Sequence, residues 1–207
     1  MNFQKKESPH QRISLHKSQG SIEWAAGMFF LVFMAVLLCV EFQREVYRSA
    51  GLYMEDALAA SNLASALFDI EEYGISHKVQ ISNPKQAYER YQSAVKANLQ
   101  LNDNWECANP ALISGPVSIE KYIVYNVDGE GITICTLNAN GTVNISQGDL
   151  GKVVAPNGIR ITNTSVYSEI AFPLKGMFGI QVRAHKGKLV DIVSDVQEES
   201  MTTEMGG

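Results

Sequence analysis

Cysteine and histidine, the residue types that most often ligate metals or act as nucleophiles, are few in this sequence. The cysteines are Cys39, Cys107 and Cys135, and the histidines are His10, His16, His77 and His185. No two cysteines have CxxC spacing and no histidine lies near a cysteine, so neither a zinc site nor dithiol redox chemistry is favoured. The HExxH, GxSxG, SxxK and Walker patterns are also missing. We therefore expect no catalytic, metal-binding or cofactor-binding residues and a protein that is not an enzyme.

Two of the cysteines have a structural interpretation. Cys107 and Cys135 both follow the apolar segment described below, and in an oxidising compartment they can form a disulfide. A bridge closing the loop between them would stabilise the fold by about 3 kcal/mol on the loop-entropy model. The alternative is that both are buried thiols. Cys39 lies inside the apolar segment, where it acts as a small apolar residue.

Charge is distributed unevenly along the chain. Residues 1–20 carry a net charge of +3, whereas from Glu41 to the end 13 basic residues stand against 20 acidic ones. Phosphate contacts need clustered lysine and arginine, and no such cluster occurs after Glu41. A nucleic-acid partner is therefore excluded.

The strongest single pattern is an apolar run near the N-terminus. Residues 24–40 contain no charge, and Ile22 and Phe42 extend the run beyond Glu23 and Glu41. About twenty apolar residues cross a bilayer of roughly 30 Å, so the run is near the lower bound for one transmembrane helix. The basic tail favours a cytoplasmic N-terminus and an extracytoplasmic C-terminal domain. A buried core helix is the first alternative, and a cleaved signal sequence, whose core is usually shorter, is the second.

Helix-forming residues continue past the membrane run without a proline as far as Tyr73, with Gly74 as a terminator. A stripe of small and apolar residues recurs on this helix at spacings of three and four. Its members are Val46, Ala50, Tyr53, Ala57, Ala60, Ala64 and Leu67. We expect Ala57, Ala60 and Ala64 to form a close-packing face, either against another subunit or against the chain's own domain, with Ser61 turned away from it.

The remaining sequence indicates an α+β domain. Asn83 as N-cap and Pro84 at the first helical position predict an amphipathic helix over 84–101. From residue 119 the period changes to two, and the turns DGEG and NANG predict two consecutive hairpins. Further strands are expected over 158–174 and, joined by the turn HKGK, over 179–184 and 189–193. The second helix is expected to cover one face of a sheet of five to seven antiparallel strands.

The predicted organisation therefore has four parts. Residues 1–20 form a basic cytoplasmic tail, and 21–74 form a transmembrane helix that protrudes from the membrane. Residues 75–195 form the extracytoplasmic α+β domain, and 196–207 form a flexible tail.

The N-terminal part resembles the TadE-like pseudopilins, or minor pilins, of tight-adherence (Flp) pilus systems. The matching residues are Gly20, Ser21, Ile22 and Glu23, the pair Glu41 and Phe42, and the alanine-rich segment 55–66. The resemblance covers roughly the first 70 residues. It implies that Glu23 neutralises the terminal amine of a neighbouring subunit in the membrane, or else lies at the level of the lipid headgroups.

The same resemblance implies a processing site at Gly20 and Ser21. In the family a peptidase cuts after a glycine and leaves the glutamate at the fifth mature position. A cut after Gly20 would leave Glu23 at the third position, and a cut after Ser18 would restore the fifth.

The function that we expect is that of a structural or assembly subunit of a cell-surface pilus or secretion apparatus. Its partners would be the lipid bilayer and other pilin-like subunits or platform proteins. The alternative is a membrane-tethered extracytoplasmic binding domain that acts with a partner membrane protein. Such a tether needs no close-packing helix face, whereas an assembly subunit does.

Overall fold

The computed structural model describes residues 19–66, 73–75, 78–108, 113–138, 141–176 and 181–192, with side chains described from residue 22 onward. Most of the predicted cytoplasmic tail, the predicted flexible tail 196–207 and Leu67 of the predicted stripe lie outside these residues. The chain divides into two compact units, Met1–Arg44 and Glu45–Gly207. This division comes earlier than the predicted boundary after residue 74, because the second half of the first helix packs into the folded domain.

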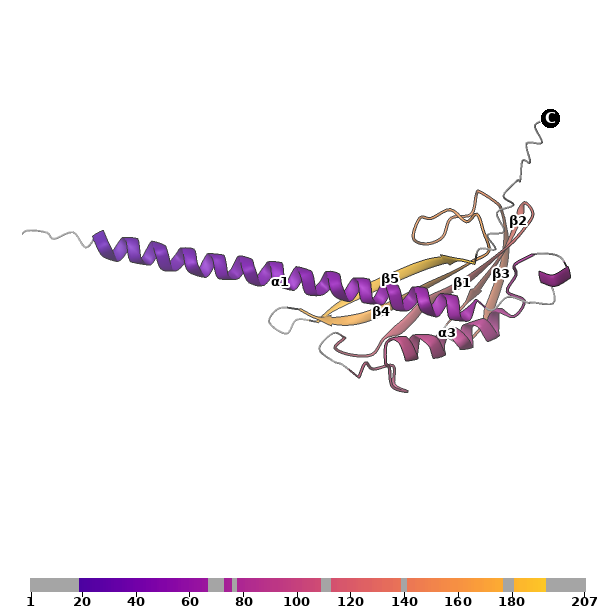
Figure 1. Cartoon of the computed structure of the whole chain (residues 1–207), viewed down its shortest axis with the longest axis horizontal. Helices are drawn as coiled ribbons and strands as arrows, with labels where there is room; N and C mark the ends of the chain where they lie inside the picture. Colours follow the sequence, from indigo (N-terminus) through magenta and orange to yellow (C-terminus); the bar gives the residue numbers. More distant parts are fainter. Residues whose placement is uncertain are drawn as a thin grey trace, which may run out of the picture. The chain divides into compact units, whose positions relative to one another are not determined.

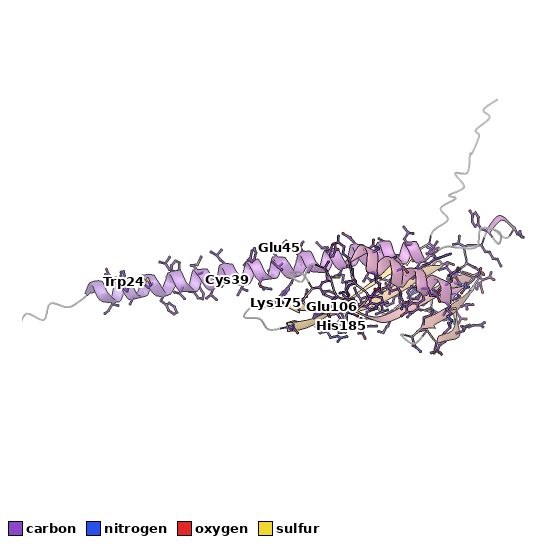
Figure 2. The ribbon with its side chains drawn as sticks, turned by 90° about the horizontal axis from the view of Figure 1, so that it is seen from below. Trp24, Cys39, Glu45, Glu106, Lys175 and His185 are labelled. Carbon is purple, nitrogen blue, oxygen red and sulfur yellow. The ribbon has the colours of Figure 1, made fainter. Side chains whose placement is uncertain are left out.

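The first helix, α1, runs continuously over Gln19–Ser65 and is 47 residues long (Figure 1). In the first unit every side chain over residues 22–42 is exposed, including those of Trp24 and Cys39 (Figure 2). The predicted long apolar helix is thus confirmed, and in length and hydropathy it is sufficient to cross a membrane.

The C-terminal end of α1 differs from the prediction, because the helix ends at Ser65 and not at Tyr73. The last turn contains Ser61, Asn62 and Ser65, whose side chains compete with the main chain for hydrogen bonds. The Ser65 hydroxyl donates to the Asn62 carbonyl at 2.7 Å, and the Ala66 N–H is shared between the carbonyls of Asn62 and Leu63. A separate helical turn covers 73–75.

Helix α3 spans Pro84–Asn98 and begins where the sequence predicts. The Asn83 side chain caps it by accepting a hydrogen bond from the Gln86 N–H at 3.1 Å. Its buried residues, Ala87, Tyr88, Tyr91 and Val95, recur at helical spacing on one face. The helix ends before the predicted limit, since Gln100 adopts a left-handed conformation with φ of 52°.

The five described strands form one antiparallel sheet in the order β3-β2-β1-β4-β5. Their bounds are Ser118–Asp128 for β1, Gly131–Leu137 for β2, Val143–Asp149 for β3, Ser165–Lys175 for β4 and Gln181–Asp191 for β5. The two predicted hairpins are confirmed as β1–β2 and β2–β3. The α+β class is therefore correct, and β3 and β5 are the two edges of the sheet.

The predicted turn HKGK is wrong, because β5 is a single strand that passes through it and pairs along its whole length with β4. Gly187 is a close-approach position and not a turn residue. The ring of Tyr167, on the neighbouring strand, lies against it, and a Cβ at residue 187 would collide with the tyrosine hydroxyl.

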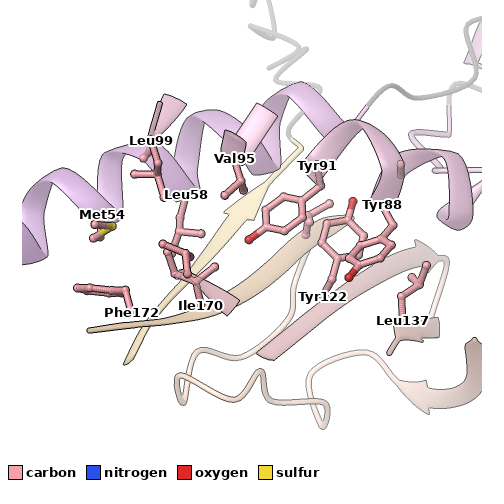
Figure 3. Close-up of a cluster of buried hydrophobic side chains, with 14 of the residues drawn as sticks. Met54, Leu58, Tyr88, Tyr91, Val95, Leu99, Tyr122, Leu137, Ile170 and Phe172 are labelled. Atoms are coloured by element: carbon pink, nitrogen blue, oxygen red, sulfur yellow. The ribbon is translucent and has the colours of Figure 1, made fainter. Parts of the chain in front are cut away.

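The main core lies between the two helices and one face of the sheet. Met54 and Leu58 from α1, and Tyr91 and Val95 from α3, point toward the strand residues (Figure 3). The strand residues on this face include Tyr122, Val124, Cys135, Leu137, Ile170 and Phe172. The opposite face carries a smaller cluster, in which Ala155 and Ile161 from the β3–β4 connection cover Ile123, Tyr125 and Tyr167.

Candidate functional site

The half of α1 that belongs to the folded domain buries one face. Ala50, Met54, Ala57 and Leu58 supply its apolar part. The following turns bury polar residues in the same direction, and Ser61, Asn62 and Ser65 are completely inaccessible. Because buried polar groups are costly unless they are hydrogen-bonded, the contacts of these three residues decide how α1 is held.

Each of the three buried polar residues binds a different part of the domain. The Asn62 side-chain amide donates to the Lys188 carbonyl at 2.9 Å on the edge strand β5. Tyr122, on the central strand β1, donates its hydroxyl hydrogen to Ser65 Oγ at 2.9 Å. Ser61 Oγ accepts a hydrogen bond from the Asn98 side chain of α3 at 3.0 Å. A helix that slid or rotated would lose all three bonds, so these contacts fix the register of α1 on the sheet.

One carboxylate on α1 adds an ionic contact. Glu55 lies between Lys186 and Lys188 of β5, with N–O distances of 2.7 Å and 2.8 Å. Hydrogen bonds from Lys186 and then Lys188 hold the pKa of Glu55 at about 2. The carboxylate is consequently charged at every physiological pH.

The predicted packing face is divided by the structure. Ala57 is buried within the domain, whereas Ala60 and Ala64 are exposed. Ser61, which we expected to turn away, is part of the buried face. The reason is that hydrogen bonds of serine and asparagine determine which face is buried. A pattern based only on small and apolar residues does not include these polar residues.

The exposed side of α1 in the folded domain mixes apolar and charged residues, since Arg48 and Asp56 are exposed beside its leucines. Leu52 is 55% exposed and Leu63 is 61% exposed. Their spacing of eleven residues, with Ala60 and Ala64 beside Leu63, places all four on one side of the helix. We call these four residues the outer α1 face. It is the part of the described domain that best fits a helix-packing surface.

The predicted processing and membrane residues lie at the start of the helix. Gly20 and Ser21 belong to its first turn, although their side chains lie outside the described residues. Glu23 is exposed. Nothing in the described residues tests cleavage or the role of Glu23, so these remain predictions.

The predicted disulfide is not formed, because Cys107 and Cys135 are both free. Cys107 is half-buried, and its thiol lies 3.5 Å from the Leu99 carbonyl as a donor. Cys135 is buried in β2, where burial raises the pKa of its thiol. The structure therefore agrees with the alternative of two thiols, with Cys135 in the core and Cys107 packed against it.

A hollow of about 370 Å³ lies beside the edge strand β3, on the sheet face that carries the helices. Its apolar lining is Ile81, Pro84, Cys135 and Ile145. The wall at Ile81 is held by a reciprocal pair: its N–H donates to Asn126 Oδ1 at 2.9 Å, and its carbonyl accepts from Asn126 Nδ2 at 3.1 Å. This pair fixes the segment that forms one wall of the hollow, and Ile145 of β3 contributes to another.

Sequence reasoning missed the ionic and polar contacts of α1. Alternating lysines at 186 and 188 lie on one face of a strand, and a single glutamate opposite them gives little signal without the fold.

Within the described residues, no three histidine, cysteine, aspartate or glutamate side chains are grouped as a metal site would require. Comparison of the chain with protein-family models, curated proteins and solved structures finds no match.

Proposed function

We propose that this chain is a single-pass membrane subunit of a cell-surface assembly, similar to TadE-like minor pilins, and that it has a structural role without catalysis. Residues 22–42 would lie in the bilayer, with the basic tail in the cytoplasm. The domain that begins at Glu45 would lie outside the membrane. The first 70 residues, through their resemblance to that family, support this proposal.

The membrane assignment rests on the exposure of the apolar segment. Side chains such as Phe29, Leu31 and Leu38 are each at least 60% exposed, and a soluble helix would bury most of them. Lipid is an environment in which such a segment is stable. The net charge of +3 before the segment supports the orientation, since cytoplasmic flanks are enriched in lysine and arginine.

The observation that carries the assembly role is the outer α1 face. The helix that would leave the membrane also carries Leu52, Ala60, Leu63 and Ala64 on the side turned away from the sheet. Small alanine side chains beside the leucines allow another helix to approach closely, which a tether has no need of. Glu55 and the buried polar residues hold α1 rigidly, so its outer face is presented in one orientation.

The test is a cross-linking experiment in cells. Ala60→Leu adds bulk to the outer α1 face, and overpacking a tight contact costs about 1–3 kcal/mol, or roughly tenfold or more in an association equilibrium. We expect this variant to lose cross-links to partner subunits while the domain stays protease-resistant. Ala97→Leu is the matched control, because Ala97 is an exposed alanine on α3.

The outcomes separate the two functions. Loss of cross-links in Ala60→Leu alone supports the subunit. If both variants cross-link like the parent, the outer α1 face binds nothing essential, and the tethered binding domain replaces the subunit. The hollow beside β3 is the feature that favours this second function.

A further inference from the structure

The edge strand β3 has free hydrogen-bonding groups on its outer side. In the β2–β3 hairpin the Asn138 N–H bonds to the Thr142 carbonyl and the Leu150 N–H bonds to the Glu130 carbonyl. Antiparallel pairs alternate between bonded and non-bonded, so the pairs Cys135–Ile145 and Leu137–Val143 are non-bonded. The main-chain groups of Val143, Ile145 and Gln147 therefore point away from β2. Within the described residues no hydrogen bond reaches them.

This edge also lacks the features that usually prevent strand addition. Residues 143–148 include no proline and no charged side chain, and Ile145 is 68% exposed. Ile145 also lines the hollow beside β3, on the helix side of the sheet. A strand that paired with β3 would therefore place a side chain next to Ile145, at the outer rim of the hollow.

We infer that β3 and the adjacent hollow form a docking site for an extended segment of another polypeptide, which adds to the sheet as a sixth strand. Three outward residues over 143–147 fit an occupant of about five to seven residues, since a strand rises about 3.4 Å per residue. Main-chain bonds would supply affinity, and an apolar side chain opposite Ile145 would pack against that residue at the rim of the hollow.

Charge indicates what else the occupant carries. At the Asp149 end of β3, Asp128 and Asp149 are paired with Lys78 and Lys152 at 2.6 Å and 2.8 Å. Glu130, in the turn beside them, is exposed and has no cationic partner among the described residues. A lysine or arginine at that end of the occupant would neutralise it.

A second copy of this chain is the competing occupant. Two β3 edges would pair antiparallel about a two-fold axis normal to the sheet. Each Glu130 would then lie near the 138–148 segment of the other copy, which contains no lysine or arginine. Charge therefore favours a different polypeptide, one that carries a cation at this end.

The probe is a fluorescein-labelled seven-residue peptide of alternating isoleucine and threonine with a terminal lysine, titrated against the full chain in lipid nanodiscs. We expect saturable binding by fluorescence anisotropy. Ile145→Lys should weaken it at least tenfold, because charge on an edge opposes strand addition. Ile159→Lys, at a comparably exposed isoleucine of the β3–β4 connection, should bind like the parent.

Two further arms test the mode of binding. The peptide N-methylated at alternate backbone nitrogens should bind at least tenfold more weakly, because it cannot complete the ladder. Glu130→Gln should weaken binding of the lysine peptide and leave a peptide without lysine unaffected. Circular dichroism of all variants should match the parent.

Absence of saturable binding at millimolar peptide, or equal binding by Ile145→Lys, would overturn the site. Self-association of the parent that Ile145→Lys abolishes, without peptide binding, would assign the edge to a second copy instead. Labelling of the tail and the domain measures the membrane orientation in a separate experiment. Failure of the docking site would therefore leave the proposed membrane subunit testable, and failure of the membrane orientation would leave the docking site testable.

Discussion

Gly187 offers a sharp test of the fold, because it stands where the sequence predicts a turn and the structure has a strand. An ideal Cβ at this residue would lie 2.9 Å from Tyr167 Cζ and 3.2 Å from Cε2. Favourable carbon–carbon contacts are about 3.5–4.0 Å, so Gly187→Ala forces the ring or the strand to move by about 0.5–1 Å. The ring is buried, which leaves it little room.

The expected cost follows from two opposing effects. Overpacking costs about 1–3 kcal/mol, and replacing glycine restores about 0.4–1 kcal/mol by restricting the unfolded chain. The net loss is about 1–2 kcal/mol, which lowers Tm by about 2–8 °C in a chain of this size. Thermal unfolding of the full chain in detergent, followed by circular dichroism, measures it.

The matched control is Gly131→Ala, whose Cβ would meet nothing closer than the Asp128 carbonyl at 3.6 Å. This variant should be as stable as the parent or more stable by up to about 1 kcal/mol, because it gains the same restriction of the unfolded chain without a clash. Gly187→Ala combined with Tyr167→Leu should be no less stable than Tyr167→Leu alone. If Gly187→Ala is as stable as the parent or more stable, the ring does not cross β5, and the reasoning is refuted.

Two other predictions concern Glu55 and the cysteines. Because Lys186 and Lys188 lower the pKa of Glu55 from 4.5 to about 2, its contribution to stability is complete above about pH 4.5 and is lost as the pH falls toward 2. Glu55→Gln should therefore narrow the difference in the free energy of unfolding between pH 6 and pH 3. The change should be less than about 1 kcal/mol, because the pair is partly exposed, and an unchanged difference would contradict the ionic contact. After denaturation without reductant all three thiols should react with maleimide, whereas reaction of Cys39 alone would show that Cys107 and Cys135 are bridged.

Much of the fold could be predicted from the sequence, because its signals are local. The apolar run, the cap formed by Asn83 and Pro84, and the glycine turns of the two hairpins each depend on a few neighbouring residues. β5 could not be predicted, since the meaning of Gly187 depends on Tyr167, a residue that only strand pairing brings next to it.

The candidate site was less accessible to sequence reasoning for a similar reason. A stripe of alanines identifies a helix side that tolerates close approach, but it does not say which side the sheet occupies. The buried side is chosen by Ser61, Asn62 and Ser65, whose partners lie on β1, β5 and α3. As a result Ala57 is buried, while Ala60 and Ala64 remain on the outer α1 face.

The most direct test of the account is the orientation of the chain in a membrane. In a protein without its native cysteines, one cysteine is introduced either in the tail, by Ser14→Cys, or in the domain, by Asp103→Cys at a fully exposed side chain. A membrane-impermeant maleimide is then applied to intact protoplasts. We expect labelling at residue 103 without permeabilisation and at residue 14 only after it. Labelling of residue 14 in intact cells, or protection of residue 103, would contradict the proposal that α1 anchors an extracytoplasmic domain.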